Sequence, residues 1–306
     1  MTLVLWWHFC FFRLKAVDEF VGNTWYNVNI TTCTKARNYM KSTEYEKYLN
    51  LISQKKFEEA VSFKADKIPT VLHKYFGLNK DKTLNLQKIQ CIAENKLYLS
   101  DFNSFNDPFE GKYFVFNGDK LSKKGWDKSQ IEEFINGLTA LWRVTCLSDT
   151  NEQNMPMWAY YANNHEGFCV EYILCDLQKK YILPVAYEKE RQEANSIVTH
   201  IINAAMTVKM SGTPPSEEFS LYNHLMFLSM TAKHISWEHE REYRIMSPDR
   251  YFPAIPSKIY IGLNCTDENR EKLIDIGKSS DGICKVYQMY LDSNNSKFEL
   301  QKQKIV

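Results

Sequence analysis

The segment 237–244 constrains the fold more than any other stretch of the chain. It reads Trp-Glu-His-Glu-Arg-Glu-Tyr-Arg, so three glutamates alternate with other residues before a final arginine. In a strand these carboxylates and Arg244 would share one face, because successive side chains point to opposite sides. Like charges on one face repel unless a cation, a ligand or water separates them. The segment is therefore either part of a site or a solvated face, such as a frayed helix end with an ion pair between Glu238 and Arg241.

The charge balance and the cysteines narrow the class of protein. The 306 residues hold 38 Lys and Arg against 37 Asp and Glu, which leaves a formal net charge of +1. This balance carries no strong nucleic-acid signal and no general attraction to an anionic membrane. The eight cysteines include no Cys-x-x-Cys pair, which indicates reduced thiols in a cytoplasmic protein. Motifs of zinc enzymes, serine hydrolases, dinucleotide folds and P-loop enzymes are absent from the sequence.

The first 39 residues are predicted to lie outside the folded domain. Residues 3–12 form an apolar run, but a helix that spans a bilayer needs about 20 residues. Arg13 and Lys15 follow this run, whereas a signal peptide carries its positive charge before the apolar run. We therefore expect 1–39 to be an irregular extension upstream of a natural start at Met40, and we predict no transmembrane segment. A membrane-surface anchor is the alternative.

From residue 40 the chain reads as a single domain, 40–306, with a short helical lead-in over 40–66. Helical stripes and capping motifs predict further helices at about 84–93, 129–138, 155–162, 193–209, 216–233 and from 266. Alternating or short apolar runs predict strands at 71–76, 96–100, 112–116, 141–148, 168–174, 183–187, 243–246, 258–263, 287–291 and 298–300. This order indicates an α+β fold with a mixed, largely antiparallel sheet and flanking helices.

The stretch 101–111 is a candidate binding loop. It is dense in Asn, Asp, Pro and Gly but also holds three phenylalanines, so it should pack down as a polar loop. Asn106, Asp107 and Glu110 are its candidate binding residues, and an Asx turn capped by Asn106 and Asp107 is the alternative. Asp107, Glu110 and Lys112 also resemble the site of a metal-dependent nuclease. They lie too close together for ligands carried on strands, and we predict no metal.

Dispersed motifs resemble the bacterial family called domain of unknown function 2971. The resemblance covers about 40–306, and its motifs lie at 73–75, 97–100 with 105–110, 146–148, 157–162, 167–171, 184–187 and 237–244. It implies no activity, because the family name records none.

A second similarity, to the layout of ADP-ribosyltransferases, implies a chemistry. In that superfamily an early His or Arg holds the NAD ribose or phosphates, a Ser or Tyr frames the nicotinamide pocket, and a late Glu polarises the ribose 2′-hydroxyl. His73 (or Lys74), Ser100 and the pair Glu240 and Glu242 follow in that order here. The resemblance implies NAD as a co-substrate, with His73, Glu240 and Glu242 as catalytic residues. A carboxylate suits this reaction because it stabilises the developing oxocarbenium ion.

Together these features predict a polar cleft that binds NAD or a related small nucleotide and transfers ADP-ribose or cleaves the glycosidic bond. The predicted substrate-binding residues are Lys74, Tyr75, Ser100, Asn106, Asp107, Glu110, Trp158, Tyr161 and Arg244. Aromatic rings suit stacking on nicotinamide, and Arg244 is the cation that lets the carboxylates coexist. A non-catalytic sensor or interaction module, for instance in phage defence, and the metal-dependent nuclease are the alternatives. No feature of the sequence indicates an oligomeric state.

Overall fold

The computed structural model describes residues 42–105, 107–195, 227, 229–280 and 282–306. The predicted N-terminal extension, Asn106 and most of the helices predicted at 193–209 and 216–233 lie outside these residues. Within the described ranges, no helix combines the length and the apolar character needed to cross a bilayer.

The helices of the described residues are α3 (Ser42–Ser53), α4 (Phe57–Lys67), α5 (Lys82–Ala93), α6 (Gly118–Ser122), α7 (Lys128–Thr139), α8 (Met155–Tyr161), α9 (Asp176–Lys180) and α12 (Asp267–Ser279), with 3₁₀ helices η3 (Phe102–Ser104) and η4 (Ile235–Glu240). The strands are β1 (Val71–Phe76), β2 (Lys96–Tyr98), β3 (Ser100–Asp101), β4 (Phe114–Val115), β5 (Arg143–Ser148), β6 (Phe168–Ile173), β7 (Ile182–Pro184), β8 (Ala186–Glu188), β9 (Gln192–Glu193), β10 (Ala232–His234), β11 (Glu242–Ser247), β12 (Tyr251–Pro253), β13 (Pro256–Ile261), β14 (Lys285–Tyr290) and β15 (Gln301–Lys304).

One mixed, mostly antiparallel sheet organises the described residues, which confirms the predicted α+β class. Its order is β15-β14-β13-β6-β1-β5-β11-β7, with β3 beside β5. The pairing of β13 with β14 is parallel, whereas the other strand pairs described in this sheet are antiparallel. Three two-stranded sheets, β10-β8, β12-β2 and β4-β9, accompany it.

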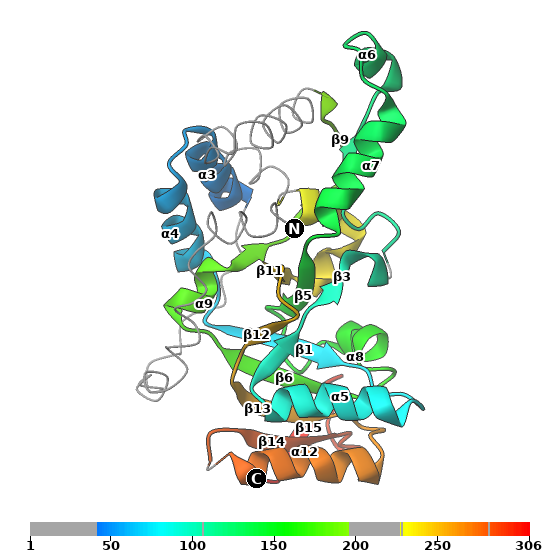
Figure 1. Cartoon of the computed structure of the whole chain (residues 1–306). Coiled ribbons are helices and arrows are strands. Elements are labelled where there is room, and N and C mark those ends of the chain that lie inside the picture. The colour runs from blue at the N-terminus through cyan, green and yellow to red at the C-terminus, as the bar shows by residue number, and fades with distance from the viewer. Residues whose placement is uncertain (1–41, 106, 196–226, 228, 281) are drawn as a thin grey trace. The chain divides into compact units, whose positions relative to one another are not determined.

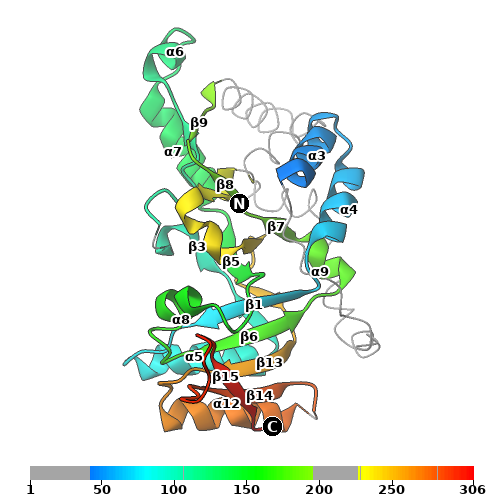
Figure 2. The same cartoon turned by 180° about the vertical axis from the view of Figure 1, so that it is seen from behind.

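Helices cover both faces of this sheet near β1 (Figures 1 and 2). Successive residues of a strand point to opposite faces. On one face, Leu72 of β1 belongs to an apolar core that also includes Ile89 of α5 and Leu273 of α12. On the other face, Tyr75 packs in a second cluster with Trp158 of α8. The helices α5 and α12 therefore bury one side of the sheet, and α8 covers the other side beside β1.

The sheet is nearly divided between β1 and β5. Six residue pairs join β1 to β6, and six join β5 to β11. In contrast, the described pairing of β1 with β5 consists of one pair, His73 with Ser148. Strands β1 and β5 therefore separate on either side of this pair. Side chains, and not backbone hydrogen bonds, occupy the space between the two strands.

The predicted helical lead-in is wrong in one respect, because it is two helices and not one. The helix α3 ends at Ser53 and α4 begins at Phe57. Between them Lys55 takes a left-handed conformation with φ of 61°. The helices turn back on each other so that Tyr48 and Ile52 pack against Ala60. A single apolar stripe over this stretch hides the turn, because no Gly or Pro marks it.

Two predicted strands are each divided in the structure. The stretch predicted at 96–100 becomes β2, which pairs with β12, and β3, which pairs with β5. The stretch predicted at 183–187 becomes β7, which pairs with β11, and β8, which pairs with β10. In both cases the chain passes from one sheet to another within a few residues, and alternation of side chains does not reveal a change of partner.

The ends of other predicted elements also move. The helix predicted to run to 233 gives way to β10 at Ala232–His234. The closing strand lies at Gln301–Lys304 instead of 298–300, and Phe298 is fully exposed. On α5, Leu86 is exposed, while Asn85 is buried and its side-chain amide donates to the Asn79 carbonyl.

Candidate functional site

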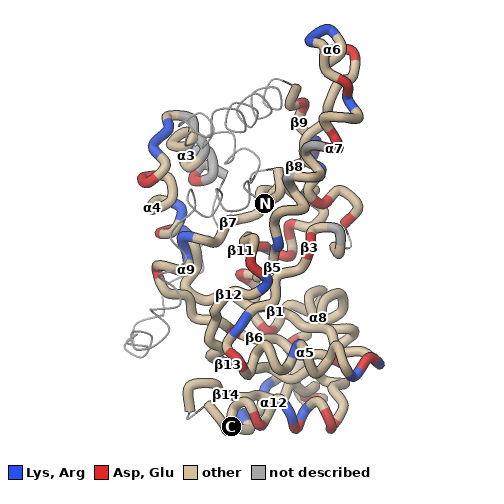
Figure 3. Tube along the Cα trace, in the orientation of Figure 1, with Lys and Arg blue, Asp and Glu red and all other residues tan. Residues whose placement is uncertain are grey.

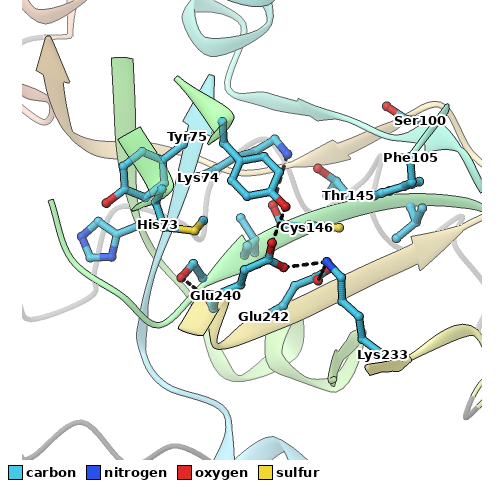
Figure 4. A pocket seen from close by; sticks show the side chains of 15 residues that line it. His73, Lys74, Tyr75, Ser100, Phe105, Thr145, Cys146, Lys233, Glu240 and Glu242 are labelled. Carbon is cyan, nitrogen blue, oxygen red and sulfur yellow. Dashed lines mark hydrogen bonds and ion pairs between the residues drawn. The ribbon is translucent and has the colours of Figure 1, made fainter. Parts of the chain in front are cut away.

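A cavity of about 140 Å³ lies where β1 and β5 part (Figure 4). It is lined by His73, Lys74, Tyr75, Ser100, Phe105, Val144, Thr145, Cys146, Leu147, Ser148, Met157, Tyr161, Lys233, Glu240 and Glu242. A buried cavity of roughly 150 Å³ is enough to hold one benzene-sized ring. A space of this volume therefore suits a single ring or sugar, and any larger ligand must extend beyond it.

The cavity brings together seven of the residues predicted from the sequence. They are His73, Lys74, Tyr75, Ser100, Tyr161, Glu240 and Glu242. Four other predicted residues do not line it, namely Asp107, Glu110, Trp158 and Arg244. Asn106 lies outside the described residues.

Two carboxylates in the cavity wall share one ammonium group. The Lys233 Nζ of β10 lies 2.6 Å from Glu240 Oε2 and 3.2 Å from Glu242 Oε2. Arg244 holds the other oxygen of Glu242, with Nε 2.7 Å from Oε1. All four side chains are buried, and Figure 4 shows Lys233 facing both glutamates. We call the chain of contacts formed by Glu110, Arg244, Glu242, Lys233, Glu240 and Tyr161 the Glu242 network.

The backbone before β11 explains why Glu240 and Glu242 meet. Residues up to Glu240 form the 3₁₀ helix η4, and Arg241 then takes a left-handed conformation with φ of 47°. The prediction of one continuous strand face is therefore wrong before Glu242, and Glu238 is exposed on η4. The turn at Arg241, whose guanidinium pairs with Asp149, directs Glu240 into the same buried space as Glu242.

The two glutamates are pushed toward opposite protonation states. Burial raises the pKa of Glu240, nearby Glu242 adds to the rise, and Lys233 opposes it. Burial also acts against the charge of Glu242, but Arg244 and Lys233 outweigh it and hold its pKa at about 2. Paired carboxylates with divergent pKa values are a common arrangement for acid and base roles. Glu242 thus keeps its charge to lower pH than an ordinary glutamate, and Glu240 takes up a proton at a higher pH than an ordinary glutamate.

Arg244 ties the network to the loop after η3. Its Nη1 donates to the Glu110 carboxylate and to the Met230 carbonyl. Figure 3 shows acidic and basic positions gathered around β11 and β5. Because Arg244 is fully buried, its charge depends on these partners. Arg244 is therefore the cation that the sequence predicts between carboxylates, although it stands behind the cavity wall.

The other residues of this loop make local contacts. The Asp107 carboxylate accepts from the Phe109 amide at 2.9 Å, as in the Asx turn that is the alternative to a binding role. Lys112 Nζ donates to the Pro108 carbonyl at 3.0 Å. With Glu110 paired to Arg244, the three residues of the nuclease hypothesis face different partners. Among the described residues, no group of three or more His, Cys, Asp or Glu side chains is arranged to hold a metal ion.

Helix α8 supplies one aromatic residue to the cavity and one to the core. The Tyr161 hydroxyl donates to Glu240 Oε1. Trp158 is fully buried, and its Nε1 donates to the Glu152 carbonyl at 2.8 Å. Its ring meets Tyr75 edge to face, with centroids 5.3 Å apart. Trp158 therefore packs in the core and does not line the cavity, whereas Met157 and Tyr161 of the same helix do.

His73 forms part of the cavity wall but belongs to a second buried group. Its Nε2 lies 3.5 Å from Glu171 Oε2 on the neighbouring strand β6. Glu171 also accepts from Ser257 Oγ at 2.8 Å and pairs with Lys258 Nζ at 2.9 Å. We call His73, Glu171, Ser257, Lys258 and Tyr260 the Glu171 cluster. In Figure 4 the His73 ring is turned away from Glu240, so the two predicted catalytic residues share a cavity without contact.

Lys74 bridges the gap between the two halves of the sheet. Its Nζ donates to the Cys146 carbonyl of β5 at 3.1 Å. Strand β1 would satisfy such a carbonyl with its backbone if the two strands paired along their length. Burial lowers the pKa of Lys74 and raises that of the Cys146 thiol well above its usual range. The lysine thus supplies a half-buried polar group to the cavity at the point where backbone pairing stops.

Sequence reasoning misses Lys233, the residue that unites the two glutamates. It is predicted as the end of a helix, whereas it lies on β10 with its side chain buried. One signal was available, since the uncompensated glutamates of 237–244 require a cation and Lys233 is a nearby lysine beside an apolar stretch. The sequence alone could not show that β10 pairs with β8 and so turns this lysine inward.

One protein-family model matches a segment of the chain that contains several residues of this site. Residues 157–245 match the model of a family described as "Protein of unknown function (DUF2971)". The match contains Tyr161, Lys233, Glu240, Glu242 and Arg244 and runs from within α8 into β11. Searches of curated proteins and of solved structures return no match.

Proposed function

We propose that the cavity binds the ring and ribose at one end of NAD or a related nucleotide, and that Glu240 acts with Glu242 on the glycosidic bond. The products would be free nicotinamide and an ADP-ribose unit transferred to an acceptor or to water. The observation that carries this proposal is the pair of buried carboxylates, two residues apart, which share Lys233 and have pKa values displaced in opposite directions.

The charges of the Glu242 network favour a cationic ligand. In its direct contacts, the three carboxylates Glu110, Glu240 and Glu242 meet the two cations Arg244 and Lys233. One negative charge therefore has no partner of its own inside these contacts when every group is ionised. A pyridinium ring or the oxocarbenium ion formed when it leaves would balance that charge, and a site whose charge complements the transition state accelerates the reaction.

The walls of the cavity fit the same substrate. Its volume of about 140 Å³ matches one ring. Tyr75, Tyr161 and Phe105 offer aromatic surface, and Lys74 and Ser100 add polar groups for ribose hydroxyls or phosphate oxygens. In this proposal His73 supports the wall beside Tyr75, and the chemistry belongs to the glutamates.

A non-catalytic nucleotide sensor is the second candidate. The observation that favours it is the saturation of Glu242, whose two oxygens are occupied by Arg244 and Lys233. A carboxylate held in this way stabilises an arrangement but has no free oxygen for a reacting group. The two candidates predict the same ligand and differ in whether nicotinamide is released.

The test is incubation of the full chain with NAD that carries one label on nicotinamide and another on adenine. We expect nicotinamide release from the wild type and a loss of about 100-fold or more in Glu240→Gln, the usual effect of removing one stabilising group for a developing charge. Glu238→Gln is the matched control, because Glu238 lies in the same segment but is exposed, and it should retain activity. A wild-type protein that binds NAD without releasing nicotinamide would favour the sensor, and a protein that does neither would sink both candidates.

A further inference from the structure

Three aromatic rings form a row on the outer side of α8 and η4. The Trp237 and His239 ring centroids lie 6.2 Å apart with planes inclined by 29°. Tyr160 continues the row, with its centroid 6.3 Å from that of His239 and its plane inclined by 59°. Tyr160 is 65% exposed, more than any other tyrosine among the described residues, His239 is exposed and Trp237 is half-buried. The row therefore presents aromatic surface to solvent that a core role does not explain.

Both ends of the row lie next to residues of the cavity wall. The ring of Trp237 lies 4.7 Å from Lys233 Nζ, the ammonium that contacts both Glu240 and Glu242. At the other end, Tyr160 directly precedes Tyr161, which donates to Glu240. In both α8 and η4, a residue that lines the cavity therefore directly follows a residue of the row: Tyr161 follows Tyr160, and Glu240 follows His239.

The middle ring of the row is held in place. His239 Nδ1 lies 3.1 Å from the Ser236 carbonyl, which can only accept, so Nδ1 carries the donated proton. The Asn154 amide in turn lies 3.4 Å from the His239 carbonyl. A ring with a fixed orientation loses little conformational entropy when a ligand stacks on it.

We propose that Tyr160, His239 and Trp237 form a stacking surface for the purine base of a nucleotide whose other end occupies the cavity. The assignment rests on the proposed function in one respect, namely that a nucleotide occupies the cavity. It extends that function by predicting a ligand with two bases, since a space of about 140 Å³ encloses one ring and the aromatic row begins at its wall. Flat nucleobases stack on aromatic side chains without requiring specific hydrogen bonds.

The experiment measures AMP binding to the full chain by calorimetry, because AMP carries the purine but no nicotinamide. We expect Tyr160→Ala and His239→Ala each to weaken AMP binding by about five- to 150-fold, the range that loss of one stacked base gives. Tyr290→Ala is the control, since Tyr290 is also an exposed tyrosine but lies on β14. Both ring variants should fold, because the side chains removed are exposed, and thermal unfolding checks this.

The outcomes separate this inference from the proposed function. If the wild type does not bind AMP, or if the ring variants bind it as tightly as the wild type, the stacking surface is refuted even when nicotinamide is released. If AMP binding depends on the rings but no nicotinamide is released, the stacking surface stands and the proposed reaction fails. Ring-dependent binding of maltotriose in place of AMP would show a carbohydrate platform and also overturn the inference.

Discussion

The Glu171 cluster and the Glu242 network are both buried on the same sheet, yet they satisfy their charges differently. In the Glu171 cluster a single carboxylate accepts from Ser257 and pairs with Lys258, and His73 Nε2 lies 3.5 Å from it. In the Glu242 network three carboxylates share two cations. The first arrangement joins three strands, β1, β6 and β13. The Glu242 network has one more carboxylate than cations in its direct contacts, and it borders the cavity.

The pKa values of the two groups show what this difference means. Donation from His73, Lys258 and Ser257 outweighs burial and holds the pKa of Glu171 at about 2. In the Glu242 network, Glu242 is held equally low while the pKa of Glu240 is raised. A buried charge with complete partners stabilises the fold, and a buried charge with incomplete partners responds to a ligand or a proton. Substitutions of Arg244, Glu171 and Glu240 test this difference.

The largest expected effect is the loss of stability when Arg244 is replaced. Arg244→Met leaves Glu110 and Glu242 buried without their shared cation. We therefore expect the free energy of unfolding to fall by about 3–5 kcal/mol. Lys258→Met is the matched change in the Glu171 cluster. Glu171 keeps Ser257 and His73, and the Lys258 side chain is 35% exposed, so the cost should be about 1 kcal/mol or less. Urea denaturation measures both, and equal losses would show that the two groups do not differ as described.

The second effect is a pH dependence carried by Glu171. Its pKa falls from 4.5 to about 2 on folding, so its contribution is present above pH 4.5 and is lost as the pH falls toward 2. At neutral pH the contribution should be at most about 3 kcal/mol, from 1.36 kcal/mol per pKa unit. We therefore expect the stability difference between the wild type and Glu171→Gln to shrink below pH 4.5. A difference that stays constant across this range would contradict the assignment.

The third and smallest effect has the opposite sign and concerns Glu240. Because its pKa is raised on folding, the folded protein binds more protons than the unfolded chain above pH 4.5. The wild type should therefore lose stability relative to Glu240→Gln as the pH rises from 5 to 8. Thermal unfolding across this range measures the slope, with Glu238→Gln as the exposed control. If the stability that Glu240 contributes rose with pH, as it does for Glu171, the opposite directions of the pKa shifts of Glu171 and Glu240 would be refuted.

The sequence predicted the fold class and several elements correctly because their signals are local. Strand β1 at Val71–Phe76 and helix α8 at Met155–Tyr161 lie where periodicity places them. Predictions fail where an element changes its partner, as between β2 and β3. They fail again where a non-glycine residue takes a left-handed conformation, as Lys55 does between α3 and α4. Neither event changes the apolar pattern on which the prediction depends.

The sequence predicted which types of residue form the candidate site better than it predicted which residues contact one another there. The density of carboxylates in 237–244 indicated a site, and Glu240 and Glu242 do line the cavity. The partners of these residues were not predictable, because Lys233 reaches them through the pairing of β10 with β8 and Glu110 reaches Arg244 across 134 positions of the sequence. Trp158 shows the converse error, since an aromatic residue next to a site need not face it.

Local preferences can be read from the sequence: which stretches alternate, which form apolar stripes, and where charge is too dense to be left without a partner. The gap between β1 and β5, the turn at Arg241 and the inward position of Lys233 appear only in the folded chain. The physical reason is that local preferences act over a few residues, whereas the neutralisation of a buried charge depends on side chains brought together from distant strands. The carboxylates of 237–244 therefore indicate that cations lie nearby. The folded sheet identifies these cations as Lys233 and Arg244.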